Sequence, residues 1–366
     1  MRGGERQQSR EVLFERRGAM GLVTLNRPKA LNALNHHMID LLSAQLAEWA
    51  AEKAVARIAI TGAGERGLCA GGDIVALYED ARSGDGSASA RFFRDEYRLN
   101  SLIASHPKPI VAIQDGIVLG GGIGISAHAS HRVVTERSKL GLPETGIGFV
   151  PDVGASWLLS RAPGETGTRI ALTGSMVGAA DAIHVGLADS YVRSTSVADL
   201  LDRLETEEPD EVVAELASDP GPSALAAEAS MVDPAFAGGS VTEILAALRA
   251  LGRSEADALA DTIDAKSPLA VAVALDSLHR AKHLASLEEA LEMEYRVSCH
   301  ALTTHDFLEG VRAQVVDKDR KPVWRPSNRD DVTSDHVDAY FAPTVHGSLG
   351  LADSTNLFNE PVGRRS

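Results

Sequence analysis

The sequence has few of the features that crosslink or anchor a chain. Only two cysteines, Cys69 and Cys299, occur in 366 residues, which excludes a disulfide framework and suits a reducing compartment. No apolar run approaches the roughly 20 residues of a membrane-spanning helix. The longest run, 109–126, is interrupted by Gln114, Asp115 and several glycines. The N-terminal segment has no apolar stretch, and its glutamates are untypical of a transit peptide. We therefore predict a cytoplasmic location and no membrane partner.

Positive charge is also scarce. The chain has 36 Lys and Arg residues against 51 Asp and Glu residues, which gives a formal net charge of −15. This excess of negative charge argues against nucleic acid or an anionic membrane as the main partner. A phosphate-bearing ligand is not excluded, because its site needs only a local positive field. The histidines show no H-E-x-x-H spacing, so we predict no metal site.

The first half of the chain alternates between strand and helix patterns. Its hydrophobic fraction of 44% is ordinary for a globular protein with a substantial core. Alternating or buried β-type runs are predicted at 11–16, 21–26, 55–61, 109–113 and 132–135. Helices are predicted at 34–49, 90–105 and 123–129. Strands that alternate with helices indicate an α/β fold with right-handed crossovers.

The second half reads differently. From 197 to 316 the sequence is almost wholly helical, with periodic stretches at 199–217, 241–264, 268–283 and 286–300. After Ser327 it mixes Pro, Asn, Asp, Gly and Ser with few aliphatic residues. We predict an α/β core at 11–195, a helical C-terminal region at 196–326, and a tail at 327–366. The tail is either poorly ordered or an arm that covers a neighbouring surface.

Three glycine-centred segments stand out, at 64–74 (GERGLCAGGDI), 116–126 (GIVLGGGIGIS) and 142–154 (LPETGIGFVPDVG). Glycine next to a reaction centre lets a ligand approach the backbone, and two N–H groups on one oxygen form an oxyanion hole. Losing one such donor typically costs about 100- to 1,000-fold in rate. The alternatives are tight turns alone, or a dinucleotide-binding loop, but Ile125 breaks the G-x-G-x-x-G spacing.

Glu144 and Asp152 lie in the third segment, between prolines and glycines that prevent a regular helix. Loop geometry is therefore free to aim both carboxylates. Apolar neighbours raise the pKa of a carboxyl group and suit it to acid–base or nucleophilic work. Taken singly, each acid also fits a surface or capping role. Cys69 lies in the first glycine segment, but no histidine is near it in the sequence to activate a thiol.

Seven segments between Val12 and Pro326 carry a family resemblance. They are LNRPKALNAL (25–34), CAGGDI (69–74), FFRDEYRLN (92–100), LGGGIGISAH (119–128), PETGIGFVPDVG (143–154), ALTG (171–174) and DFLEGVRAQVVDKDRKPVWRP (306–326). Together they resemble the crotonase (enoyl-CoA hydratase/isomerase) superfamily. The last segment resembles its 3-hydroxyisobutyryl-CoA hydrolase branch in particular. The resemblance implies a spiral of ββα units with a helical C-terminal region, assembled as a homo-oligomer, a trimer or a hexamer.

The resemblance also assigns site residues. It implies an oxyanion hole made by the N–H groups of Gly72 and Gly121, with Glu144 and Asp152 as the catalytic acids. Hydratases of the family carry a second glutamate at the position of Gly124, and glycine at that of Asp152. The residues that the resemblance implies for substrate binding are Glu96, at the hydroxyacyl end, and Arg27, Lys29, Ala30, Ala70 and Asp73.

The expected activity is therefore hydrolysis of a short hydroxyacyl-CoA thioester, most narrowly 3-hydroxyisobutyryl-CoA in valine breakdown. Coenzyme A is part of the substrate, and no separate cofactor is expected. Two alternatives stay open at this point. One is hydration or isomerisation of an enoyl-CoA on the same fold, and the other is a non-catalytic protein that binds acyl-CoA.

Overall fold

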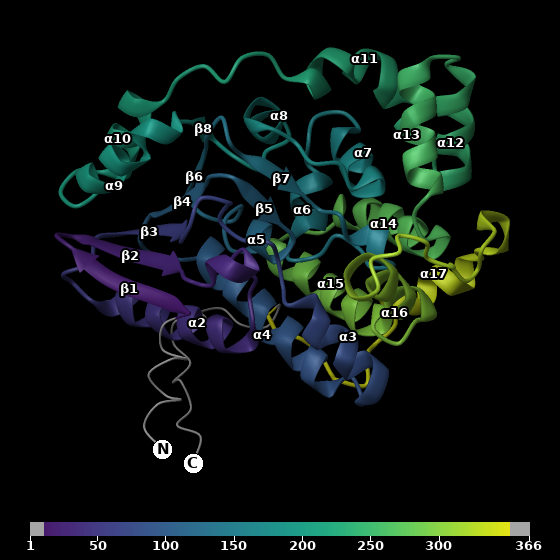
Figure 1. Cartoon of the computed structure of the whole chain (residues 1–366), viewed down its shortest axis with the longest axis horizontal. Coiled ribbons are helices and arrows are strands. Elements are labelled where there is room, and N and C mark those ends of the chain that lie inside the picture. Colours follow the sequence, from purple (N-terminus) through teal and green to yellow (C-terminus); the bar gives the residue numbers. More distant parts are fainter. Residues whose placement is uncertain (1–10, 352–366) are drawn as a thin grey trace.

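The computed structural model of the chain, which describes residues 11–351, is built around a six-stranded sheet (Figure 1). Its strands follow the order β1-β2-β3-β4-β6-β8. Their bounds are β1 Val12–Arg17, β2 Met20–Leu25, β3 Arg57–Gly62, β4 Ile110–Gln114, β6 His131–Val134 and β8 Ser190–Tyr191. β1 and β2 form an antiparallel pair, and the other neighbours are parallel. Every residue of β4 is buried, as expected for a parallel strand covered on both faces.

A second, smaller sheet pairs β5 (Ile117–Leu119) in parallel with β7 (Lys139–Gly141). Isolated bridges join Cys69 to Val118 and Leu140 to Val177, so segments on both sides extend this sheet. β5 follows β4 and β7 follows β6, with one strand of each pair in each sheet. Successive units therefore wind between two sheets, which confirms the predicted spiral of ββα units.

The helices of the core begin close to the predicted positions. They are α2 (His36–Ala51), α3 (Ile74–Ser83), α4 (Ser87–Ala104), α5 (Gly121–Gly124), α6 (Ala155–Leu159), α7 (Thr166–Thr173) and α8 (Ala179–His184). Short 3-10 turns lie at η1 (Pro28–Ala30), η2 (Glu144–Ile147) and η3 (Ser194–Ser196). The Asn35 side chain caps α2 by accepting a hydrogen bond from the Met38 N–H. The predicted helix at 123–129 is shorter than expected, because α5 ends at Gly124 and turns follow.

The C-terminal region is helical, as predicted, but more finely divided. Its elements are α9 (Val197–Arg203), α10 (Pro209–Leu216), α11 (Ala224–Phe236), α12 (Val241–Ala250), α13 (Ser254–Asp264), α14 (Pro268–Ala281), α15 (Leu287–Ala301), α16 (His305–Val311), the π-helix η4 (Arg312–Val316), η5 (Arg329–Asp331) and α17 (Ser334–Phe341). Pro209 starts a new helix because it lacks an N–H group, and Gly252, at φ +60°, separates α12 from α13. The predicted helices 199–217 and 241–264 are thus two helices each.

The described part of the predicted tail, 327–351, is folded rather than poorly ordered. Thr333 and His336 form a capping box at the start of α17. Tyr340, Leu349 and Leu351 are buried, and α17 packs against α14 and α15. This part therefore corresponds to the second alternative, an arm that covers a neighbouring surface. Residues 352–366 lie outside the described part of the chain.

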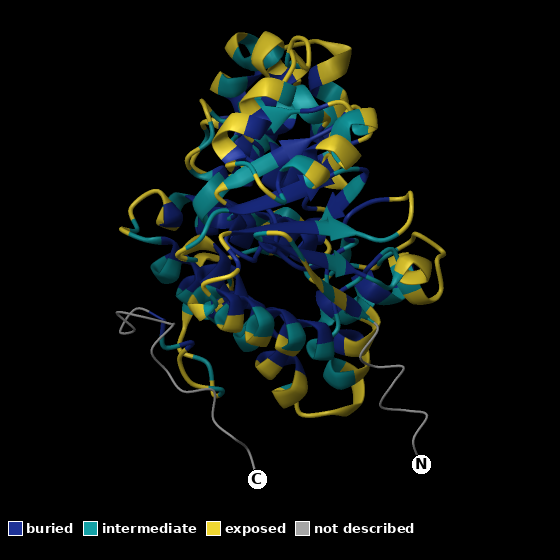
Figure 2. Ribbon diagram, turned by 90° about the vertical axis from the view of Figure 1, so that its left-hand side faces the viewer, coloured by how far each residue is buried: buried dark blue, intermediate teal, exposed yellow. Residues whose placement is uncertain are grey.

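Buried residues are concentrated in the interior of the fold, on the strands and on the inner sides of the helices (Figure 2). One hydrophobic cluster contains residues from both sides of the boundary predicted near 195, such as Leu172 and Leu291. The domain boundaries therefore remain predictions. Among the described helices, none combines the length and the apolarity that crossing a membrane requires.

Candidate active site

A cavity of about 420 Å³ lies between the two halves of the chain. The core lines it with the three glycine-centred segments and with one face of α4. The C-terminal region closes it with Lys266, Gln314 and Val315. Phe149 in the cavity wall stacks on Phe93 of α4, with 5.7 Å between ring centroids. Both halves of the chain therefore shape one site.

The first two glycine segments meet at the cavity. A Cβ atom added to Gly121 would lie 3.3 Å from the Gly72 nitrogen, and one on Gly71 would lie 3.5 Å from the Gly121 nitrogen. Gly71 and Gly120 adopt positive φ values of +100° and +46°, which favour glycine. In residues 11–351 neither the Gly72 N–H nor the Gly121 N–H donates to a protein acceptor. Two unused donors thus lie side by side at the cavity wall.

Glu144 lies at the start of η2 and borders the same cavity. Its side chain is buried, and within the described chain Oε2 has no hydrogen-bond partner. A Cβ on Gly120 would lie only 2.9 Å from Glu144 Oε1, so the carboxyl group sits against the glycine loop. Burial, and then the charge of Asp152, raise the pKa of Glu144 well above its usual value. This environment suits a group that exchanges protons or attacks a carbonyl carbon.

Asp152 is the second buried acid of the cavity. Its Oδ2 accepts a hydrogen bond of 2.5 Å from the Tyr97 hydroxyl. Burial raises the pKa of Asp152 to about 7, although the bond from Tyr97 acts in the opposite direction. A pKa near neutrality lets one group both give and take a proton.

Glu96 is the third carboxyl group of the cavity. It lies on α4, is 2% exposed, and has an Oε1 atom without a partner in the described residues. A Cβ on Gly121 would lie 2.5 Å from this atom. Burial and the charge of Asp152 raise the pKa of Glu96 well above its usual value. Because three carboxyl groups share one enclosed space, they cannot all ionise easily.

Gly124 has no room for a side chain. An added Cβ would lie 2.7 Å from Val153 Cβ and 2.8 Å from Asn100 Nδ2. Both distances are shorter than any ordinary carbon contact. A glutamate at this position would therefore displace Val153, which is the residue directly after Asp152. The packing therefore leaves no room for an acid at position 124, whereas Asp152 lies in the cavity wall.

Of the remaining residues predicted to bind the substrate, only one lies in the cavity wall. Ala70 lines the cavity, whereas Arg27, Lys29, Ala30 and Asp73 do not. Lys29 and Ala30 are exposed in η1, and Arg66 holds this turn next to the first glycine segment by donating to Lys29 O at 2.9 Å. Arg27 Nη2 lies 3.5 Å from Asp73 Oδ2 and also approaches Glu11. These residues form a partly exposed surface beside the first glycine segment rather than part of the cavity itself.

The sequence did not single out several side chains that shape the cavity. Lys266 is the only cation in its wall among the described residues, and burial lowers the pKa of its amine. Gln314 and Val315 lie in the π-helix η4, a rare form that is frequent at functional sites. Tyr97 and Gln314 belong to segments that carried the family resemblance, so these segments contained the signal. Nothing in the sequence marks Lys266.

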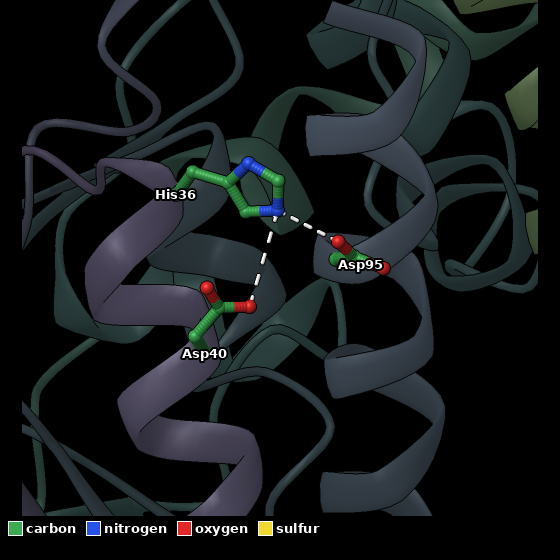
Figure 3. Close-up of side chains that lie close together, drawn as sticks. All are labelled: His36, Asp40 and Asp95. Carbon is green, nitrogen blue, oxygen red and sulfur yellow. Dashed lines mark hydrogen bonds and ion pairs between the residues drawn. The ribbon is translucent and has the colours of Figure 1, made fainter. Parts of the chain in front are cut away.

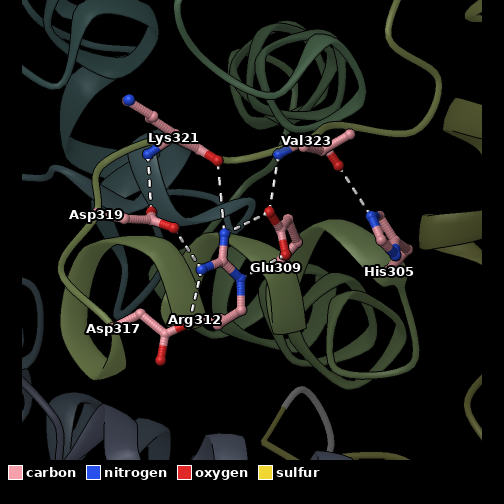
Figure 4. Close-up of polar contacts among 7 residues, drawn as sticks. All are labelled: His305, Glu309, Arg312, Asp317, Asp319, Lys321 and Val323. Carbon is pink, nitrogen blue, oxygen red and sulfur yellow. Dashed lines mark hydrogen bonds and ion pairs between the residues drawn. The ribbon is translucent and has the colours of Figure 1, made fainter.

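Arg312, the first residue of η4, ties this wall to the following loop (Figure 4). Its guanidinium donates to both oxygens of Glu309 at 2.8 Å, and to Asp317 and Asp319 at 2.7 Å each. The Val323 N–H in turn donates to Glu309 at 2.9 Å. Such a bidentate, multiply bonded arginine holds a fixed geometry. It therefore orients the turn that carries Gln314 and Val315.

Other reactive side chains lie outside this arrangement. Cys69 is fully buried behind the glycine loops, and burial raises the pKa of its thiol to about 12. Outside the cavity, His36 Nε2 lies 2.6 Å from Asp95 Oδ2 and 4.0 Å from Asp40 Oδ1, which joins α2 to α4 (Figure 3). These contacts join two helices outside the cavity lining.

The chain is similar to proteins of one family. The enoyl-CoA hydratase/isomerase family model matches residues 20–341. The 3-hydroxyisobutyryl-CoA hydrolase of Danio rerio, a mitochondrial protein by its name, is 39% identical over 93% of this chain and 92% of its own. The Homo sapiens protein of the same name is 37% identical, over 94% and 90%.

Solved structures of the same fold extend the comparison. A carnitinyl-CoA dehydratase from Mycobacterium thermoresistibile is 47% identical, with a TM-score of 0.89 over 92% of this chain and 98% of that one. An enoyl-CoA hydratase from Rhodobacter sphaeroides 2.4.1 is 39% identical, with a TM-score of 0.87 over 93% and 99%. The relatives thus bear the names of three different reactions on acyl-CoA.

Proposed function

The chain belongs to the enoyl-CoA hydratase/isomerase family, and from that premise we propose that it hydrolyses 3-hydroxyisobutyryl-CoA to 3-hydroxyisobutyrate and CoA. The observation that carries the proposal is the pairing of Glu144 with Asp152 in one cavity, while Val153 and Asn100 fill the place next to Gly124. A thioester hydrolase needs a nucleophile or base and a proton carrier, and these two acids supply both. The names of the relatives support the same reaction.

In the proposed mechanism, the thioester carbonyl oxygen lies between the N–H groups of Gly72 and Gly121. These two donors stabilise the negative charge that develops on this oxygen. Glu144 either attacks the carbonyl carbon, which gives a mixed anhydride, or takes a proton from the attacking water. The carbon–sulfur bond then breaks, and CoA leaves as the thiolate. On the anhydride route, a water then attacks the anhydride, which releases the hydroxy acid and frees Glu144. Asp152 supplies or removes the proton that each step requires.

We place the hydroxyacyl group toward Glu96. Its Oε1 has no partner within the described chain and lies beside Gly121, so a substrate hydroxyl within reach would satisfy it. The CoA nucleotide would then extend past Ala70 to the exposed surface with Arg27 and Lys29. Cations on that surface offer the local positive field that the acidic chain otherwise lacks. No further cofactor takes part in this scheme.

A second candidate is hydration of an enoyl-CoA, which the solved structures of related hydratases and dehydratases favour. Hydration adds water across a double bond and uses two acids in the same cavity. The packing at Gly124 counts against the glutamate position that hydratases use. A non-catalytic acyl-CoA-binding protein is disfavoured because it would have no need of buried acids with raised pKa values.

The deciding experiment follows two signals with 3-hydroxyisobutyryl-CoA, 3-hydroxypropionyl-CoA and crotonyl-CoA. Release of free thiol from the hydroxyacyl substrates, with the crotonyl absorbance unchanged, is the expected result. Loss of the crotonyl absorbance without thiol release would overturn the proposal in favour of a hydratase. Absence of both signals with every substrate would favour a binding protein.

The assembly of the protein and its location in the cell are separate proposals. We propose a homo-oligomer, a trimer or a hexamer, in keeping with the family, and light scattering of the purified protein tests it. The cytoplasmic location predicted from the sequence remains a prediction. Cell fractionation would test it directly.

A further inference from the structure

We infer that Glu294, far from the cavity in sequence, is a positioning residue that aims Asp152 through the turn at 152–156. The inference rests on the proposed hydrolase function and concerns the same site. Helix α15, in the C-terminal region, contributes no residue to the cavity wall in the described chain, yet by this inference it affects the reaction.

The turn after Asp152 has an unusual backbone. Val153 has φ +56° and Gly154 has φ +83°, so two successive residues lie in the left-handed region. A β-branched residue in this region is rare and strained. Such a conformation persists only where the surroundings over-determine it. The contacts that hold this turn therefore decide where the Asp152 side chain points.

Glu294 supplies most of those contacts. Its carboxylate is 1% exposed and accepts hydrogen bonds from the Gly154 N–H at 2.6 Å, the Ser156 N–H at 2.8 Å and the Ser156 hydroxyl at 2.5 Å. All three partners are donors, which is the pattern that a carboxylate satisfies. Burial raises the pKa of Glu294 to about 8, and the bonds from Ser156 and Gly154 act in the opposite direction, so the geometry of the three donors, rather than a fixed charge, holds the turn. On the other side of the turn, neutral His128 donates to Val153 O at 2.8 Å. The turn is thus clamped between α15 and His128.

The same face of α15 reaches Asp152 by a second route. Ser298 lies four residues after Glu294, one helical turn along. Tyr97 has one hydroxyl proton and gives it to Asp152, so the Ser298 hydroxyl, 2.7 Å from Tyr97 Oη, is the donor of that bond. α15 therefore holds the turn that follows Asp152 and, through Tyr97, its carboxylate.

The test is Glu294→Gln in the full chain, with Glu292→Gln as the matched control. Glu292 lies on the same helix and also accepts from two backbone N–H groups, of Leu349 and Gly350, outside the cavity. Displacing a catalytic group by about 1 Å lowers the rate roughly 100-fold. We expect Glu294→Gln to lower kcat roughly 10- to 100-fold, with KM changed less than about 3-fold, while Glu292→Gln keeps both.

A double-mutant cycle separates positioning from general damage. In an Asp152→Asn background, Glu294→Gln should cause little further loss, because the group that it positions is already gone. The inference would be overturned if Glu294→Gln lowered kcat equally in both backgrounds or did not lower it at all. It would also be overturned if Glu292→Gln lowered kcat as much as Glu294→Gln does. Wild-type protein that releases no thiol would instead overturn the proposed function, and this inference with it.

A milder variant covers the case in which Glu294→Gln does not fold. Ser298→Ala removes the donor to Tyr97 and makes Tyr97 a weaker donor to Asp152. Since the Tyr97 bond lowers the pKa of Asp152, the pH profile of kcat should shift toward higher pH. An unchanged profile in Ser298→Ala would contradict the relay from α15.

Discussion

The α/β core and the helical C-terminal region contribute to one cavity in different ways. The core provides Glu96, Glu144 and Asp152 together with the two free glycine N–H groups. As far as residue 351, the C-terminal region adds no carboxyl group to the wall, but it closes the cavity with Lys266 and η4 and clamps the turn after Asp152 from α15. The comparison teaches that reactive groups and their exact orientation come from separate parts of the chain. Each can therefore be altered without the other.

The largest expected effect tests whether the chemistry resides in the core. Glu144→Gln should lower the rate of thiol release roughly 100- to 10,000-fold, because an amide neither attacks a carbonyl nor takes a proton. Single-turnover thiol release from 3-hydroxyisobutyryl-CoA measures this loss. Glu136→Gln, at an exposed carboxylate that binds Ser194, serves as the control and should keep the wild-type rate. A Glu144→Gln protein with near wild-type activity would move the chemistry elsewhere.

A second variant tests how tightly the core is packed around Asp152. Gly124→Ala places a methyl group 2.7 Å from Val153 Cβ, and overpacking of this kind costs about 1–3 kcal/mol of unfolding free energy. Urea denaturation measures the loss. Gly178→Ala is the control, since a Cβ at Gly178 meets no atom within 4 Å and its φ of −84° suits alanine. Equal stability of the two variants would contradict the packing argument.

A third variant tests the contribution of the C-terminal region. Arg312→Met removes the side-chain bonds from η4 to Asp317 and Asp319 in the loop after it, and Gln314 and Val315 are then held less firmly in the wall. We expect kcat/KM to fall about 10-fold, as for other losses of substrate positioning. Arg280→Met removes a similar group, paired with Asp276 and Asp338 outside the cavity, and should leave kcat/KM unchanged.

The smallest expected effect concerns stability and pH. Burial raises the pKa of Glu144 in the folded state above its usual value of 4.5. The folded state therefore holds a proton that the unfolded state has lost, and its stability declines as the pH rises through the folded-state pKa. Glu144→Gln removes this decline. Its melting temperature should exceed that of the wild type at pH 8, by roughly 1–2 °C per kcal/mol relieved, and the gain should shrink toward pH 4.5.

Much of the architecture could be predicted because it depends on patterns of apolar residues within single segments of the chain. The strands at 12–17 and 110–114 and the helix at 36–51 follow short-range hydrophobic periodicity. The breaks inside 199–217 and 241–264 were missed, although Pro209 and Gly252 mark them. Of the two alternatives predicted for the tail, residues 327–351 take that of an arm, because its few apolar residues, such as Tyr340, are buried against α14 and α15.

The candidate site divides in the same way. Glycine and proline mark the loops that carry Glu144, Asp152 and the paired glycines, and the family resemblance implied their roles. The bond from Gly154 to Glu294 spans 140 residues, and that from Tyr97 to Ser298 spans 201. No periodicity within one segment reports such contacts. The second layer of the site therefore required the three-dimensional structure.

The burial of Cys69 bears on the chemistry of the released product. A protein that liberates CoA works in the presence of a free thiol and of the disulfides that this thiol forms. Thiol–disulfide exchange needs a thiolate, and the raised pKa of about 12 leaves Cys69 almost wholly protonated at neutral pH. The Gly71 N–H donates to its sulfur at 3.3 Å, so the atom is enclosed directly behind the glycine loop. Product inhibition through a mixed disulfide at this position is thereby prevented.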